Sequence, residues 1–175
     1  MPTYDAIGTR VGIRRPTDAD CDEFLALTRA SEAFHQPWVD LPKSRERYEE
    51  YLASRLTEWY DGFFICDAQT HQIVGVINLN VITRGALQSA YLGYWIGESF
   101  ARKGYMTEGI KLVTQYAFTE LGLHRVEANI QPGNLASIAL VRKCGFQKEG
   151  FSPKYLRVFG EWRDHERWAL LAEVT

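Results

Sequence analysis

Short runs in which apolar and polar residues alternate recur along the chain, and this period of two predicts β-strands. The clearest run is HRVEANI at 124–130, where Val126, Ala128 and Ile130 would share one face and pack into a core. Similar runs and short apolar stretches predict further strands at 11–15, 63–66, 73–82, 91–97, 153–159 and 161–172. About seven strands are therefore expected.

Four other segments carry apolar residues three or four positions apart, which is the period of an amphipathic helix. They begin after Pro16, after Pro42, near Thr107 and at Asn134. The apolar positions of the second are Tyr48, Tyr51, Leu52, Leu56 and Trp59, and those of the third are Met106, Ile110, Val113, Ala117 and Leu121. Because helices separate only some of the strands, we expect an α+β fold with a mixed sheet.

The size and composition of the chain exclude several classes of protein. Its 175 residues are 46% hydrophobic and contain no linker or repeat, which favours a single domain over 1–175. No run approaches the roughly 18 apolar residues of a membrane helix, and the first 16 residues show no secretory signal. The formal net charge of −2 argues against a protein held to nucleic acid mainly by phosphate neutralisation.

The cysteines and histidines indicate neither disulfides nor a metal. Cys21, Cys66 and Cys144 are odd in number and widely spaced, as is typical of reduced thiols in a cytoplasmic protein. Together with the four histidines they show no metal-ligand spacing, so no metal is expected.

Arg102, Lys103 and Gly104 lie directly between a predicted strand and the helix that follows it. A helix N-terminus presents unpaired N–H groups and a partial positive charge, so this junction can hold an anion. A nucleoside-triphosphate loop is disfavoured, because Ile110 stands where that loop needs its lysine. An anion site and an ordinary turn with solvated basic residues both fit these local residues.

Four segments then follow one another in a characteristic order, after a QPW tripeptide in the first loop. They are AYLGYWIGESFARKGYMTEG, HRVEANIQPGN, GFQKEGF and YLRVFGEWRDHERWAL. Together they resemble the GNAT acetyltransferase superfamily, and within it the RimJ/RimL branch of ribosomal-protein alanine N-acetyltransferases. The resemblance covers nearly the whole chain. It implies a mostly antiparallel sheet that splays at a central parallel pair, with about four helices.

The resemblance also implies acetyl-CoA as the cosubstrate. The backbone of Trp95, Ile96 and Gly97 would pair with the pantetheine arm. The pyrophosphate would lie among Arg102, Lys103, Gly104, Tyr105, Met106 and Thr107. Asn134 would bind the pantetheine, although its position also fits a helix N-cap, and Arg142 or Lys143 would meet the 3′-phosphate. Ala101 and Met106 depart from the family turn, a small change because backbone N–H groups do most of the binding there.

The implied reaction is direct attack of a neutral amine on the thioester. A free α-amine titrates at about 8, so a base must first take its proton. Glu127 is the first candidate and Glu98 the second; an ordinary solvated or ion-paired glutamate is the alternative for each. RimL-type members carry a glutamate on the late strand where this chain has Leu156, so the chain leans toward RimJ.

The departing CoA thiolate needs an acid, and the family parallel puts Ser137 there. Tyr155 on the late strand is the rival, and an ordinary helix-surface serine is the alternative interpretation of Ser137.

The acceptor would be bound by aromatic residues. His35 and Trp38 lie in the loop that closes over the acceptor in this family, and Tyr91 is a third candidate; packing into the core is the alternative for the loop aromatics. Among all aromatics, the expected cleft set is Trp38, Tyr91, Trp95 and Tyr155, and the expected core set is Trp59, Phe63, Phe64 and Phe118.

The resemblance therefore implies an N-acetyltransferase that acts on a protein N-terminal amine, with a ribosomal protein as one possible partner. The alternatives are an acetyltransferase of small amines (amino sugar, polyamine or antibiotic) and a lapsed enzyme that binds CoA as a sensor. No membrane or direct nucleic-acid partner is expected, and the resemblance allows a homodimer.

Overall fold

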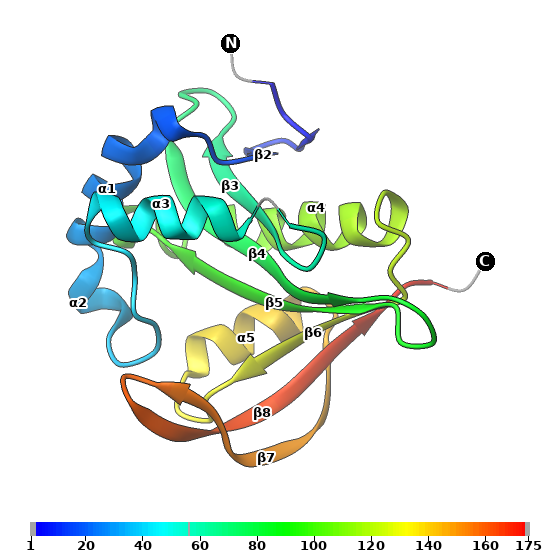
Figure 1. The fold of residues 1–175 in the computed structure, drawn as a ribbon. Helices are drawn as coiled ribbons and strands as arrows, with labels where there is room; N and C mark the ends of the chain where they lie inside the picture. The colour runs from blue at the N-terminus through cyan, green and yellow to red at the C-terminus, as the bar shows by residue number, and fades with distance from the viewer. Residues whose placement is uncertain (1–2, 56, 174–175) are drawn as a thin grey trace.

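The computed structural model describes residues 3–55 and 57–173, which build one eight-stranded sheet with helices on both faces (Figure 1). The strands are β1 (Ala6–Ile7), β2 (Val11–Arg14), β3 (Asp61–Asp67), β4 (Ile73–Thr83), β5 (Ser89–Ile96), β6 (Arg125–Ile130), β7 (Gln147–Val158) and β8 (Glu161–Leu171). The helices are α1 (Cys21–Ala30), α2 (Glu32–His35), α3 (Arg45–Ser54), α4 (Tyr105–Thr119) and α5 (Leu135–Lys143), with 3-10 turns at Asp18–Asp20 and Glu98–Phe100.

The strand order is β1-β2-β3-β4-β5-β6-β8-β7, and every neighbouring pair is antiparallel except β5 and β6. This confirms the expected mixed, mostly antiparallel sheet with one central parallel pair. The count is eight because the two-residue strand β1, too short to leave a periodic pattern, adds to the seven expected.

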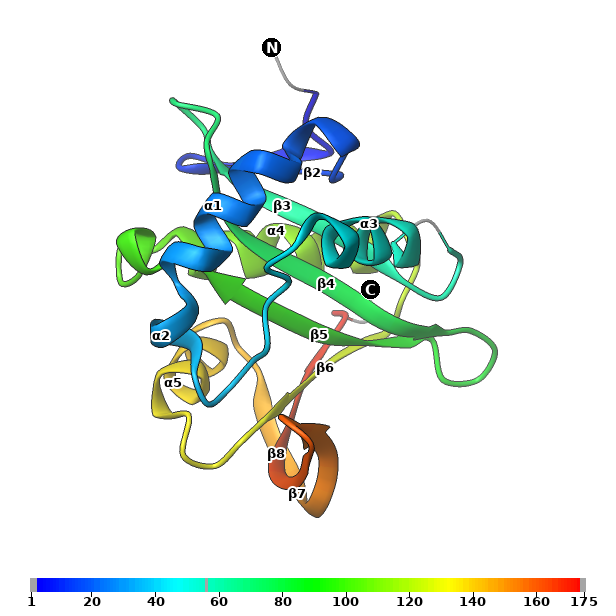
Figure 2. The same ribbon diagram turned by 60° about the vertical axis from the view of Figure 1, so that its left-hand side comes forward.

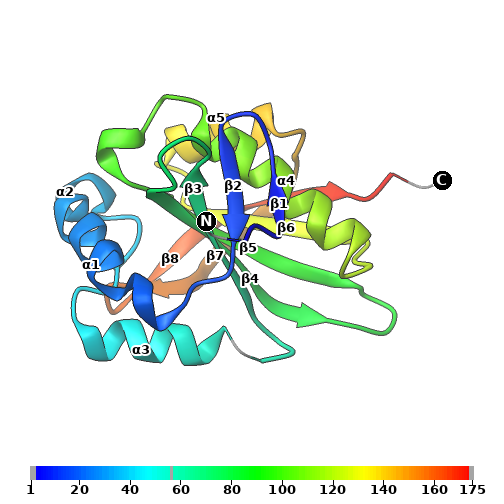
Figure 3. The same cartoon turned by 90° about the horizontal axis from the view of Figure 1, so that it is seen from above.

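Two helical layers enclose the sheet (Figures 2 and 3), with α1 and α3 on one face and α4 and α5 on the other. Side chains alternate between the faces, so Phe63 packs in the core under α4 whereas Phe64 packs in the core under α1 and α3. The predicted apolar stripe of α4 is confirmed at Met106, Ile110, Val113 and Ala117, which are all buried, and Leu121 is half-buried beyond the helix end.

The second helix is shorter than the sequence predicted. Helix α3 ends at Ser54, because the chain must turn back within a few residues to enter β3 at Asp61. Trp59 therefore lies in the turn, where its side chain is 54% exposed and its carbonyl accepts from the Ile82 amide, so its place in the core set was wrong. Leu56 lies outside the described residues.

Two further boundaries differ from the prediction. The loop after α1 contains the single-turn helix α2. Strand β7 begins at Gln147 rather than 153, because its first residues pair with β8 in spite of their mixed polar sequence. None of the helices in the described part of the chain combines the length and apolar character needed to cross a membrane.

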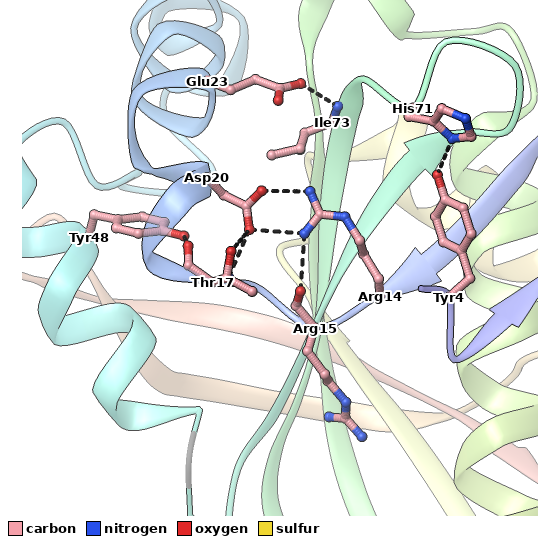
Figure 4. A network of polar contacts seen from close by, with 9 residues as sticks. All are labelled: Tyr4, Arg14, Arg15, Thr17, Asp20, Glu23, Tyr48, His71 and Ile73. Atoms are coloured by element: carbon pink, nitrogen blue, oxygen red, sulfur yellow. Dashed lines mark hydrogen bonds and ion pairs between the residues drawn. The ribbon is translucent and has the colours of Figure 1, made fainter. Parts of the chain in front are cut away.

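A buried ion pair fastens the start of α1 to the sheet (Figure 4). Two guanidinium nitrogens of Arg14 donate to the two Asp20 carboxylate oxygens at 2.9 and 2.6 Å. The same carboxylate accepts from the Thr17 amide at 2.7 Å and from its hydroxyl at 2.8 Å, while Tyr48 donates to the Thr17 carbonyl at 2.6 Å. The network therefore ties β2, α1 and α3 together.

We expect the substitution Asp20→Asn to lower the free energy of unfolding by about 2 kcal/mol at neutral pH, because Arg14 loses its ionic partner inside the fold. Burial alone would raise the pKa of Asp20, but hydrogen bonds from Arg14 and Thr17 outweigh it and hold that pKa below its ordinary value. Such a carboxylate contributes stability that is present above its ordinary pKa and lost as the pH falls through the folded-state pKa. Urea unfolding of the parent protein and of the Asp20→Asn variant, from neutral to acid pH, measures this difference in the free energy of unfolding. Equal stabilities of the two proteins at neutral pH would contradict the prediction.

Candidate active site

Strands β5 and β6 separate after only three paired positions. The pairs are Ser89 with Arg125, Ala90 with Val126 and Tyr91 with Glu127. Strand β5 then continues to Ile96 beside β4, and β6 continues to Ile130 beside β8, so the two strands diverge (Figures 1 and 2). The expected splay is thus confirmed. It leaves one backbone edge of β5 open to pair with an extended ligand.

The far end of this open edge leads to the N-terminus of α4. Gly104, the N-cap residue, adopts a left-handed conformation with φ 86°, and no side chain in the described ranges caps the helix. The first-turn N–H groups, those of Tyr105, Met106 and Thr107, are therefore available to an anion. Arg102 and Lys103 are exposed beside them, although Lys103 Nζ folds back to the Ser99 carbonyl at 2.7 Å.

A third cation, Arg10 from the turn between β1 and β2, reaches the same loop. Its guanidinium donates to the Lys103 carbonyl at 2.5 Å and lies 3.3 Å from the point where a Cβ on Gly104 would stand. Its backbone amide donates to Glu108 Oε1 at 2.9 Å, which fixes the turn against α4. Arg10 could not be predicted from the sequence, because it lies 93 residues from Lys103 and no motif includes it.

On the face of the sheet that α4 and α5 cover, Tyr94 and Ser137 meet across the splay. Their hydroxyl oxygens lie 2.5 Å apart. Asn134 does cap α5, with its Oδ1 accepting from the Ser137 amide at 3.2 Å, and its NH₂ group remains to bind a ligand. Cys144 is buried, and burial raises the pKa of its thiol, which favours the protonated form of the sulfur.

On the opposite face, Tyr91, Glu127 and Tyr155 gather where the strands begin to diverge. The neighbouring Tyr155 hydroxyl and partial burial raise the pKa of Tyr91 to about 12. Glu127 accepts from Arg125 Nε at 2.6 Å, and the same Arg125 also pairs with Glu149. Three candidates from distant parts of the sequence are thereby brought together.

Asn129 follows on the same face of β6, one pleat farther into the splay. Its Oδ1 is a buried acceptor with no partner in the parts of the chain that the structure describes. Buried polar atoms are normally paired, so an unpaired amide oxygen here points to a ligand group that donates to it.

The two loop candidates lie in different surroundings. His35 is buried and donates from Nε2 to the Ile96 carbonyl at 2.7 Å, so it holds the end of β5, and burial lowers its pKa. Trp38 packs against Gly133 and lines an open hollow of about 310 Å³, shared with Gln131, Pro132, Gly133, Lys154, Trp162, Arg163 and Asp164. Only Trp38 therefore borders space that an acceptor could enter.

The remaining candidates lie apart from the splay. The side chain of Trp95 is 6% exposed in the core beside Phe24, so only its backbone borders the open edge. Glu98 stands beyond the end of β5 on an exposed 3-10 turn. Arg142 and Lys143 are exposed at the C-terminal end of α5, with Arg142 5.1 Å from the Trp168 ring.

A larger hollow of about 550 Å³ lies near the Arg14–Asp20 pair. Its main charged groups already bind one another, which makes it a poor candidate for a ligand site. In the described residues, no three histidine, cysteine or acidic side chains come together to hold a metal ion.

Comparison with known proteins gives consistent matches over most of the chain. A family model described as an acetyltransferase (GNAT) domain matches residues 10–147. A probable N-acetyltransferase of Bacillus subtilis, YjcK, is 34% identical over 94% of this chain and 95% of that protein. The uS5-alanine N-acetyltransferase of Escherichia coli is 31% identical over 97% of this chain and 92% of that protein. The structure of Mycobacterium smegmatis RimJ in complex with a CoA disulfide superposes with a TM-score of 0.86 at 28% identity, covering 93% of this chain and 82% of that one.

Proposed function

The chain belongs to the GNAT acetyltransferase family and is an N-acetyltransferase, and on this premise we propose that it acetylates the α-amine of a protein N-terminus with acetyl-CoA. The observation that carries the proposal is the open edge of β5. It runs from the uncapped N-terminus of α4 past Tyr94, whose hydroxyl meets Ser137 on one face of the sheet, to Tyr91, which is paired with Glu127.

The residues present fit CoA. The first turn of α4 with Gly104, Arg102 and Lys103 would hold the pyrophosphate, and the backbone of 95–97 with Asn134 would hold the pantetheine. Arg142 or Lys143 would meet the 3′-phosphate from the end of α5. When bound, acetyl-CoA supplies a thioester whose carbonyl carbon is the electrophile for the amine.

This orientation favours Glu127 over Glu98 as the base. If the phosphates lie at α4, the reacting end lies toward Tyr91, because the pantetheine extends along β5. Glu98 is seven residues from Tyr91, or roughly 20 Å along an extended strand, whereas Glu127 pairs with Tyr91 directly. Glu127 would take the proton of the amine, and Ser137 would give a proton to the sulfur from the other face, with Tyr155 as the alternative acid.

The acceptor side favours a peptide over a small amine. From Glu127 to Gln131, at the edge of the hollow beside Trp38, the distance along β6 is roughly 13 Å. A peptide whose amine reaches Glu127 would pass the unpaired Asn129 oxygen and enter this hollow about four residues later. A location in the cytoplasm agrees with this proposal, since all three cysteines are free and buried.

Release of CoA in the presence of acetyl-CoA and Ala- or Ser-initiated peptides tests the proposal, with amino sugars and polyamines assayed in parallel. Mass spectrometry should place the acetyl group on the peptide α-amine. Turnover with the small amines alone would contradict the peptide assignment. Calorimetry showing tight acetyl-CoA binding without any acetylated product would indicate a CoA sensor instead.

We also expect Arg10→Ala to weaken CoA binding about fivefold, because a cation is removed from the anion-binding end of α4. Calorimetry with CoA and with dephospho-CoA should show the same loss if Arg10 acts on the pyrophosphate. Arg84 is a matched control, since its guanidinium also donates to a backbone carbonyl, that of Leu121, away from α4's N-terminus. An Arg84→Ala variant that binds CoA as weakly as Arg10→Ala would contradict the specific role.

A further inference from the structure

The hydrogen bond between Tyr94 and Ser137 connects the two arms of the splay. Tyr94 stands on β5 three residues beyond the last β5–β6 pair, and Ser137 stands in the first turn of α5, which follows β6. Their oxygens are 2.5 Å apart, a short distance for two hydroxyl groups. This contact therefore lies across the gap that the open edge of β5 borders.

Either hydroxyl of this pair can donate to the other, and the surroundings favour Tyr94 as the donor. Tyr94 packs against the core under α4 and α5, and this burial raises the pKa of its phenol, so it stays protonated. The Ser137 amide is already held by Asn134 Oδ1. If Tyr94 donates its single hydrogen to Ser137 Oγ, the serine hydrogen must point away from Tyr94 and is free to enter the splay.

We propose that Tyr94 is a positioning residue: it holds the Ser137 hydroxyl so that the serine hydrogen points at the sulfur of CoA. The inference rests on the proposed acetyl transfer. As the carbon–sulfur bond breaks, its electron pair stays on sulfur and Ser137 gives its proton to that sulfur. Solvent then returns a proton to Ser137, whose oxygen stays hydrogen-bonded to the Tyr94 hydroxyl throughout. Glu127 releases to solvent the proton that it took from the amine, so protons balance.

The substitution Tyr94→Phe removes only the hydroxyl. It is expected to reduce kcat about tenfold while the affinity for CoA, measured by calorimetry, stays within twofold of the parent protein. Ser137→Ala should reduce kcat further, and the double variant should equal Ser137→Ala alone because the two groups act as one unit. Fully additive losses, or an unchanged kcat in Tyr94→Phe, would overturn the proposal.

Tyr48→Phe is the matched control for stability. Tyr48 is also a buried tyrosine, and its hydroxyl donates to the Thr17 carbonyl at 2.6 Å, far along the sheet from β6. Both variants lose one buried phenolic hydrogen bond. A drop in kcat for Tyr48→Phe as large as that for Tyr94→Phe would show that the effect is one of general stability and would overturn the positioning role.

A second measurement needs no acceptor. A hydrogen bond from Ser137 stabilises the thiolate of bound CoA and lowers the pKa of that thiol below its value in free CoA. Thiolate absorbance of the CoA complex across pH should show this lowering in the parent protein and its loss in Tyr94→Phe and Ser137→Ala. Equal thiol pKa values in all three would contradict the inference. This result is obtained whether or not peptides are acetylated, so it separates failure of the inference from failure of the proposed function.

Discussion

Replacing Glu127 by glutamine is expected to slow acetyl transfer about 100-fold, because the amine then loses the group that takes its proton. Glutamine keeps the shape and can still contact Arg125, so the fold should be retained. Steady-state rates with a saturating peptide, compared for the parent protein and the variant, measure this loss.

Two variants control for this result. Glu149 pairs with the same Arg125 from the edge strand β7, which β8 separates from β6, so Glu149→Gln disturbs the ion-pair network without touching the splay. Glu98→Gln tests the other candidate base. Both should retain most of the activity. If Glu127→Gln were fully active at every pH, or Glu98→Gln were the inactive protein, Glu127 would not be the base.

The substitution Gly104→Val is expected to weaken acetyl-CoA binding about 100-fold, equivalent to about 2.7 kcal/mol. A β-branched residue at φ 86° carries a strain of about 1–3 kcal/mol. The strain is relieved by a change in backbone conformation, and that change would redirect the first N–H groups of α4. The added side chain would also meet the Arg10 guanidinium. Titration calorimetry with acetyl-CoA measures the loss.

Gly85 supplies the control, since it also has a left-handed conformation, with φ 70°, and has no atoms within 4 Å of an added Cβ. It lies in the turn between β4 and β5, at the opposite end of β5 from Gly104. Gly85→Val should therefore lose comparable stability but bind acetyl-CoA normally. Normal binding by Gly104→Val would exclude the α4 N-terminus as the pyrophosphate site.

Local patterns predicted most of the elements because each depends on neighbours in sequence. The alternation of 124–130 became β6, and the stripe from Met106 to Ala117 became the buried side of α4. The prediction was wrong for Trp59, where an apolar residue at helical spacing falls after the helix has ended. Spacing shows which residues could share a helix face, but the position of the next strand decides where the helix stops.

The site could be predicted only in part, since its contacts join residues that are distant in sequence. The strand-to-helix junction at Arg102–Gly104 was visible as a local motif. The contact of Arg10 with Lys103 spans 93 residues and that of Tyr94 with Ser137 spans 43, and no periodicity encodes either. Tyr91 and Tyr94 lie on opposite faces of β5, and each has a partner on its own face: Tyr155 for Tyr91 and Ser137 for Tyr94.

The position of β8 inside the sheet bears on how the protein is made. β8 lies between β6 and β7, so residues 161–171 form an inner strand although they come last among the strands. Until the ribosome has released them, β6 is paired with β5 at only three positions and β7 has no neighbouring strand at all. A nascent chain that stops short of β8 would expose both edges, and such edges are prone to wrong pairing. Acetyl transfer should consequently begin only after residues 161–171 have left the ribosome, even though the residues proposed to bind CoA and to react are complete by 155.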